Sequence, residues 1–510
     1  MENDTASSAR TERHAKIVFA ILFALVIFEI VNTFFRFALV YTDMDQALLW
    51  NAANDIAHGH FHGFCFYGQS YNPLIEPLFA VPFIWLGLNT NVALSLVATF
   101  LGVVPYLLIA IVFYKKYGVY TAIVPLIIIL LLPPEFIMSI SMARGFVAGV
   151  FFTVIGMLLF MYQTKRIYFI LAGLCIGLGF YTNPNGILLF PLMIPILFDK
   201  SDPIKPRVLF TFLGFCIGLI PLAINQFYYT HHPEMIIHAS PDSTFSIHTF
   251  LSVLTHLDDY FDPIAPVFWR AGWISLFFFI IIAVLLFKKG QKIKFYTVLI
   301  VLFLIILSLS FDKVLDATNS IYFSGARFYL AYPVILIFII TWGFQELRPH
   351  QKNIYLYVSI TLALLSFSVK VFALEAFMKI DLGPSKNSIV QVMRVDGLFD
   401  KCRQLKNFPN EKPGLIIGMK DDKILNYGCP CMINDFPPDI LYDYERRTWL
   451  LSKMKDSVYS RILIYGLDTA AWQKTNALMK GGIIKGDKMQ GLLFINNNKK
   501  TGEILKEITF

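Results

Sequence analysis

The sequence predicts a polytopic α-helical membrane protein with a small α/β domain at its C-terminus. Of the 510 residues, 56% are hydrophobic and only 15% are charged, which is more apolar than a soluble protein of this length. The apolar residues gather in runs of about 15 to 25, long enough to cross a bilayer as helices. From residue 378 onward charged residues become frequent and the apolar runs shorten, so the membrane part is expected to be 1–377 and the α/β domain 378–510.

About eleven transmembrane helices are expected from these runs. They cover residues 17–41, 91–114, 119–134, 145–163, 167–182, 186–199, 208–228, 269–287, 294–311, 327–345 and 355–377. The segments near 167–199 are short for a span and are expected to be tilted or partly re-entrant. The first run is too long for a secretory signal and no small-residue cleavage site follows it, so we expect a retained helix.

Successive loops between the apolar runs are alternately rich and poor in lysine and arginine. This asymmetry predicts the orientation of the chain in the membrane. The rich loops carry Arg10, Arg13, Lys16, Lys115, Lys116, Lys165, Arg166, Lys200, Lys205, Arg207, Lys288, Lys289, Lys292, Lys294, Arg348 and Lys352, whereas the alternate loops hold mainly Arg144, Arg270, Lys313 and Arg327. The rich side is expected to be cytoplasmic. The N-terminus is then cytoplasmic. The first outer loop 42–90, the loops near 135–144, 229–268 and 312–326, and everything after 378 face outward. Topology therefore accounts for the formal charge of +8, and no nucleic-acid partner is expected.

The segment Tyr71–Leu88 is apolar but short for a span and contains Glu76 and three prolines. A span here would reverse every later loop and break the charge pattern. We therefore expect an interfacial helix on the outer leaflet, with Trp85 at a depth that suits it.

The C-terminal part predicts strands at 414–420, 461–467 and 491–497, with a helix after Asp468 as its N-cap. If this part faces an oxidising compartment, Cys402 is expected to pair with Cys429 or Cys431, since a bridge within "CPC" is geometrically poor.

The first outer loop contains acids directly after a membrane span. Asp43 either caps the helix that begins near Met44 or acts chemically. Asp45 falls in the first turn of that helix, where Leu48, Leu49 and Ala52 form an apolar face, and it is the stronger candidate for a functional carboxylate. The alternating His58, His60 and His62, and the outer acids Asp258, Asp259 and Asp262, are favoured as solvated loop residues over a metal site.

Basic residues at the outer ends of spans are candidates for binding a phosphate. Arg327 lies in "SGARFYLAYPV", where an outer loop meets a span. Its planar fork suits a lipid-linked phosphate, although simple snorkelling to headgroups explains it equally well. Arg144 in "ISMARGF" and Lys313 are weaker candidates for the same role.

Taken in order, "MDQ" after the first span, "YNPLIEPLFAVPFIWLG" and the late "RFYLAYP" resemble the GT-C superfamily of membrane glycosyltransferases. The chain is most similar to its protein-mannosyltransferase and aminoarabinose-transferase branch, of the family 39/83 type. The resemblance covers about residues 17–345. It implies transfer of a hexose or pentose from a polyprenyl-phosphate carrier to a lipid, protein or polysaccharide acceptor of the cell envelope, at the outer face of a bacterial inner (plasma) membrane.

The resemblance also implies roles for individual residues. Asp45 falls at the position of the family's catalytic acid, with Asp43 as the alternative, and Gln46 replaces a second acid of the family. Arg327 falls near the carrier phosphate, and the segment holding Tyr71, Asn72 and Glu76 borders the cavity. No second carboxylate of a retaining pair is evident, so inversion is expected. A divalent cation is possible but is not required by the sequence.

Three other functions stay open. A transporter or flippase of lipid-linked sugars would use the same cavity without breaking a bond, although no internal repeat of the kind common in transporters is evident. An O-antigen ligase or polymerase would centre its chemistry on a large late outer loop. In a non-catalytic envelope scaffold, the C-terminal domain would do the binding.

Overall fold

The computed structural model describes residues 2–162, 165–198, 204–238, 244–316, 320–383, 392–408, 413–419, 423–433, 440–442 and 455–508. The chain divides into two compact units. The helical unit comprises Met1–Ala38, Leu96–Ala223 and Pro241–Val390, and the mixed unit comprises Leu39–Ser95, Ile224–Ser240 and Gln391–Phe510.

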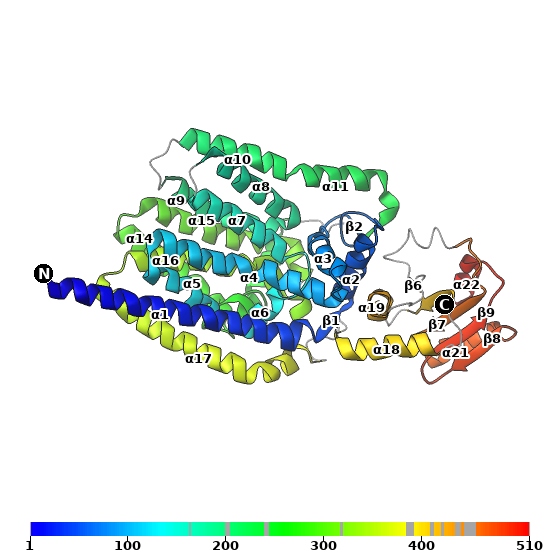
Figure 1. The fold of residues 1–510 in the computed structure, drawn as a ribbon. Coiled ribbons are helices and arrows are strands. Elements are labelled where there is room, and N and C mark those ends of the chain that lie inside the picture. The colour runs from blue at the N-terminus through cyan, green and yellow to red at the C-terminus, as the bar shows by residue number, and fades with distance from the viewer. Residues whose placement is uncertain are drawn as a thin grey trace. The chain divides into compact units, whose positions relative to one another are not determined.

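Two buried helices form the centre of the helical unit. α5 (Val119–Leu131) and α16 (Tyr332–Gln345) are buried along almost their whole length and pack against each other. α5 also contacts the long helices α1 (Glu2–Thr33), which continues as a π-helix over Phe34–Ala38, and α17 (Pro349–Asp381). α1 and α17 run beside each other in Figure 1.

A second group of helices packs through glycine. α8 (Arg166–Thr182) contacts both α7 (Val147–Tyr162) and α10 (Ile204–Gly218). α8 and α10 each carry two glycines four residues apart, and a Cβ on Gly173 or Gly214 would overlap the partner helix's backbone. Small residues at this spacing let helices approach closely where no water drives them together.

Further helices lie wholly or partly in the helical unit. They are α4 (Thr90–Tyr117), α6 (Pro134–Ile140), η2 (Pro184–Leu192), α9 (Met193–Phe198), α11 (Ile220–His231), α12 (Ile247–Leu254), α13 (Leu257–Phe261), α14 (Leu276–Lys288) and α15 (Lys292–Ser308). The outward faces of this unit expose large apolar side chains, including Phe212, Phe287, Phe303 and Phe372. Exposed apolar faces of this extent fit contact with lipid.

Helices occupy the segments predicted to span, but their lengths differ. In the described part of the chain, four helices are long and apolar enough to cross a membrane, or five if the bent pair Val119–Leu131 and Pro134–Ile140 is one span. Six further apolar helices have 10–17 residues. The count of eleven spans therefore stays a prediction.

The mixed unit begins with the acidic segment. β1 (Tyr41–Asp43) leads directly into α2 (Met44–Ala57) and pairs antiparallel with β4 (Val392–Arg394). β2 (Gly68–Gln69) pairs with β3 (Ile236–His238). The Cys65 amide donates to the Tyr229 hydroxyl (3.1 Å), and the Asn225 side chain donates to the Ser70 carbonyl (2.9 Å). The residues after 223 therefore anchor the loop that follows α2.

The expected helix on Tyr71–Leu88 is present, but it is shorter than the segment. α3 spans Ile75–Trp85, because Asn72 adopts a left-handed backbone with φ 58° that a helix cannot contain. Leu78, Trp85 and Leu86 are exposed, as the apolar face of an interfacial helix would be.

The C-terminal part of the mixed unit contains a five-stranded sheet of order β6-β5-β7-β9-β8. β5 (Leu415–Gly418) pairs parallel with β6 (Ile440–Tyr442) and β7 (Arg461–Tyr465), whereas β9 (Leu492–Asn496) pairs antiparallel with β7 and β8 (Ile483–Asp487). The helices are α18 (Val395–Asn407), α19 (Lys423–Met432), α21 (Thr469–Leu478) and α22 (Thr501–Ile508). The three predicted strands are present as β5, β7 and β9. Asp468 caps α21 through the Ala471 amide at 2.7 Å, as predicted.

Candidate functional site

Asp43 holds the acidic segment in place. Its carboxylate accepts a hydrogen bond from the Gln46 amide (3.1 Å) as the N-cap of α2, and its side chain is almost fully buried. It also ends β1, where it lies opposite Val392 of β4. The interpretation of Asp43 as a helix cap is therefore confirmed, and a chemical role for this residue stays a prediction.

Asp45 lies in the first turn of α2 and is partly exposed. The predicted apolar face of this helix is confirmed, since Leu48, Leu49 and Ala52 are fully buried. Backbone N–H groups at a helix N-terminus favour negative charge. A carboxylate in the first turn of α2, as Asp45 is, therefore suits this position.

Asp55, at the other end of α2, is the centre of a polar network that the sequence did not predict. Its carboxylate accepts hydrogen bonds from Asn51 Nδ2 (2.9 Å) and the Tyr67 hydroxyl (2.7 Å), and His62 Nε2 lies 3.9 Å away. The i to i+4 spacing from Asn51 is the only trace of this network in the sequence. Among the described residues no group of three or more His, Cys, Asp or Glu side chains could hold a metal ion.

The three expected cavity-lining residues lie in the same unit as Asp45. Asn72 donates from Nδ2 to Gln69 Oε1 (3.2 Å), and its carbonyl accepts from the Phe66 amide (3.0 Å). Glu76 is fully buried in the first turn of α3, which packs against α2, and Tyr71 is partly exposed. Asn72 therefore shapes the turn that brings α3 onto α2, and a cavity-lining role for these residues stays a prediction.

Arg144 and Arg327 converge on one aromatic ring of the helical unit. The Arg327 guanidinium lies 3.6 Å from the centroid of Phe323, and the Arg144 guanidinium lies 5.9 Å from the same centroid. Both side chains are nearly buried. Arg327 Nη1 also donates to the Phe323 carbonyl (2.8 Å), which fixes the plane of its fork. Two cations held beside one ring favour an anion between or above them.

Lys313, the third predicted cation, lies on the neighbouring segment η6 (Asp312–Asp316), which packs against the turn that holds Arg327. It is partly exposed. Next to it, Asp312 accepts hydrogen bonds from the hydroxyls of Thr244 and Thr249. These bonds lower the pKa of Asp312 and fix η6 against α12.

A cavity of about 270 Å³ in the helical unit is lined by carboxylates. They come from three separate segments as Glu135, Asp258, Asp259, Asp262 and Asp381, with Arg270 beside them. Asp258 and Asp259 are exposed, as expected of solvated loop residues, whereas Asp262 is half-buried, and all three line this cavity. Sequence reasoning missed the contribution of Glu135 and Asp381, although both flank predicted outer loops.

Burial raises the pKa of Asp262 to about 6, and the neighbouring Asp258 contributes in the same direction. A hydrogen bond from the Gly272 amide (2.6 Å) opposes this shift. A carboxyl group with this pKa can hold or release a proton near neutral pH. Ser324, which precedes the turn holding Arg327, also lines the cavity, so the carboxylates and the arginines belong to neighbouring parts of one unit.

Comparison with solved structures finds a similar fold over most of this chain. The chain is similar to ArnT from Cupriavidus metallidurans bound to undecaprenyl phosphate, with 11% identity and a TM-score of 0.51 over 93% of this chain and 98% of that one. The apo state of ArnT gives the same identity and TM-score over 98% and 99% of the two chains. No protein-family model matches the chain, and no curated protein matches it. Together with the apolar helices, this fold indicates a polytopic membrane protein.

Proposed function

We propose that this chain is an integral-membrane glycosyltransferase that moves a sugar from a polyprenyl-phosphate donor to an acceptor on the extracytoplasmic face of a bacterial inner membrane. The observation that carries the proposal is the fold. It matches, over 93% of this chain, that of an ArnT structure with undecaprenyl phosphate bound. The acidic turn of α2 and the paired arginines supply the two kinds of group that such a transfer requires.

Transfer from a phosphate ester needs a base for the acceptor hydroxyl and stabilisation of the departing phosphate. Asp45 acts as the base, because it is a partly exposed carboxylate in the first turn of α2. Arg327, with Arg144 beside the same ring, holds the phosphate as charge develops on it. A single displacement with one such base inverts the anomeric carbon.

The proposed topology places the N-terminus in the cytoplasm and residues 378–510 outside the membrane. The alternation of basic loops supports it. The disulfide between Cys402 and Cys429 also supports it, because disulfides persist in oxidising compartments such as the bacterial periplasm.

In the direct test, purified protein is given radiolabelled polyprenyl-phosphate sugars and the release of carrier phosphate is measured. Asp45→Asn is expected to fold and to lose at least ~100-fold in rate, the loss typical of a missing base. Asp468→Asn is the matched control, since it makes the same change at the N-terminus of α21, where asparagine still caps the helix. Equal turnover by wild type and Asp45→Asn would remove Asp45 from the mechanism.

Donor binding tests the arginines separately. Arg327→Ala is expected to weaken donor affinity by about 2 kcal/mol, or roughly 30-fold. Arg327→Lys keeps the charge but loses the fork, so it is expected to restore only part of that affinity. Donor affinity that is unchanged in Arg327→Ala would contradict the phosphate role. Movement of the carrier across the bilayer without release of its phosphate would favour a flippase.

A further inference from the structure

The segment that carries Asp45 is joined to the C-terminal part of the chain by a strand pair. In the register of β1 and β4, Tyr41 lies opposite Arg394 and Asp43 lies opposite Val392. The Arg394 guanidinium lies 5.6 Å from the centroid of the Tyr41 ring, and the Val395 amide donates to the Val40 carbonyl (2.8 Å). The backbone just before α2 is therefore fixed by residues more than three hundred positions later.

A second contact joins α2 itself to the C-terminal part. α19 packs along α2 and against α18, and Figure 1 shows α19 beside α2. Ile424, Leu425 and Tyr427 of α19 are each no more than 4% exposed. α2 is largely buried and packs against both α19 and α3. Its orientation therefore depends on where α19 lies.

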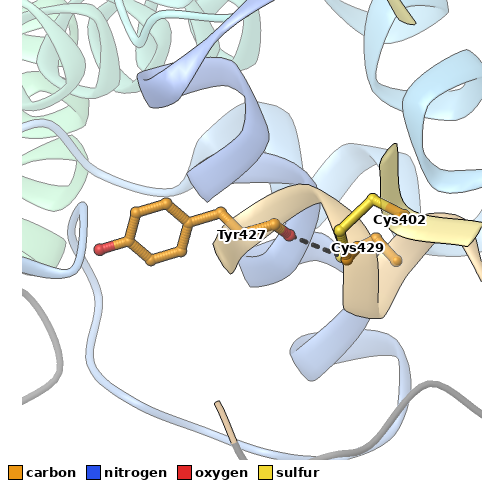
Figure 2. The surroundings of a disulfide bond; sticks show 4 residues. Cys402, Tyr427 and Cys429 are labelled. Atoms are coloured by element: carbon orange, nitrogen blue, oxygen red, sulfur yellow. Dashed lines mark hydrogen bonds between the residues drawn. A yellow bond between two sulfur atoms is a disulfide. The ribbon is translucent and has the colours of Figure 1, made fainter. Parts of the chain in front are cut away.

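A disulfide connects α18, the helix that follows β4, with α19, the helix that packs on α2. Cys402 on α18 is bonded to Cys429 on α19, with their Cα atoms 5.2 Å apart, and both residues are buried. Figure 2 shows this bond between the two helices. α18 follows β4 without a break, just as α2 follows β1. The strand pair, α2, α19, the disulfide and α18 therefore form one closed ring.

We propose that Cys402 and Cys429 are positioning residues for the acidic turn of α2. The disulfide holds α19 on α2 while β4 holds β1, so that the first turn with Asp43 and Asp45 is fixed from both ends. This assigns the start of the C-terminal part a role in the transfer reaction, and that catalytic consequence rests on the proposed function. The effect on α2 itself does not depend on it.

The test compares oxidised and reduced wild-type protein, with the extent of reduction measured by thiol labelling. Hydrogen exchange of the α2 amides is expected to rise about tenfold or more on reduction, because a local constraint is lost. The strands β5, β7 and β9 are expected to keep their protection. In the transfer assay kcat is expected to fall while the KM for the donor is unchanged, and reoxidation is expected to restore both exchange and kcat.

Two variants complete the experiment. Cys402→Ala/Cys429→Ala is expected to behave as the reduced protein without any reductant present. Cys431→Ser is the control, because Cys431 lies outside the disulfide and its thiol donates within α19 to the Tyr427 carbonyl (3.4 Å), a bond that serine can also make. It is expected to match wild type.

Unchanged α2 exchange in fully reduced protein would overturn the positioning role. A general loss of protection in the sheet would also overturn it, since the disulfide would then support only overall folding. If Asp45→Asn keeps its full rate, the proposed mechanism fails, but the exchange experiment still decides the positioning role. If Asp45→Asn is inactive while reduction leaves kcat unchanged, only the inference fails.

Discussion

A buried ion pair between α1 and α17 gives a stability prediction that is independent of function. Lys370 Nζ lies 2.5 Å from Glu29 Oε1, and the two side chains are 2% and 4% exposed. Charged groups within membrane helices are costly, and they persist where they are paired. We substitute Lys370→Met, which keeps the length of the side chain and leaves the carboxylate of Glu29 buried without its cation.

The magnitude follows from the burial of this pair. Removing one partner of a buried pair costs about 3–5 kcal/mol, whereas replacing both partners with apolar groups of similar volume is often neutral. Lys370→Met is therefore expected to destabilise the protein by about that amount, and Glu29→Leu/Lys370→Met to recover most of it. The π-helix that continues α1 and the helix α17 offer a control, Arg36 with Glu375 at 2.5 Å, whose side chains are 34% and 79% exposed. Arg36→Met is expected to cost at most about 1 kcal/mol.

The assay is thermal unfolding of the purified variants in one detergent, arranged as a double-mutant cycle for each pair. The buried pair is expected to show a large coupling energy and the exposed pair a small one. If Lys370→Met unfolds no earlier than Arg36→Met, or if the effects of Glu29→Leu and Lys370→Met simply add, the reasoning from burial is refuted.

Three further predictions follow from single residues. Asp43→Ala removes the N-cap of α2 and is expected to lower the free energy of unfolding by about 1 kcal/mol. Asp43→Asn still caps the helix and should unfold like wild type. If Asp43→Asn loses transferase activity while Asp45→Asn keeps it, Asp43 is the base instead. Between pH about 4 and the raised pKa of Asp262, about 6, the folded protein keeps a proton that the unfolded chain releases. Stability is therefore expected to fall as pH rises through that window and to level off above it, and unfolding of Asp262→Asn across this range should show a shallower decline. Gly214→Leu forces a side chain into the backbone of α8 and is expected to lower the unfolding temperature, whereas Gly290→Leu, in open space but with a positive φ of 73°, should lower it less.

Local patterns predicted much of the fold. The helix after Asp43, the cap at Asp468 and the strands β5, β7 and β9 were predictable, because each depends on the chemistry of neighbouring residues. The sequence-based prediction started α3 too early, since the residues "YNP" do not predict the left-handed backbone of Asn72. The choice of Cys429 over Cys431 depends on how α18 and α19 pack, which spacing alone could not decide.

Contacts between residues that are far apart in the sequence were much less predictable. Arg144 and Arg327 were both singled out, but their meeting at Phe323 depends on how distant segments fold together. The carboxylate cavity was missed because its members come from three separate segments that each look solvated. The pairing of β1 with β4 was missed for the same reason, since three residues on each side carry too little pattern to identify a partner.

In the proposed mechanism, the Asp45 carboxylate and the Arg327 guanidinium act on one donor. A cryo-electron microscopy structure with a bound polyprenyl-phosphate sugar analogue tests it most directly. The phosphate is expected within about 3 Å of the Arg327 guanidinium nitrogens, with the anomeric carbon of the sugar facing Asp45. A donor phosphate bound elsewhere, or a sugar that Asp45 does not face, would contradict the account.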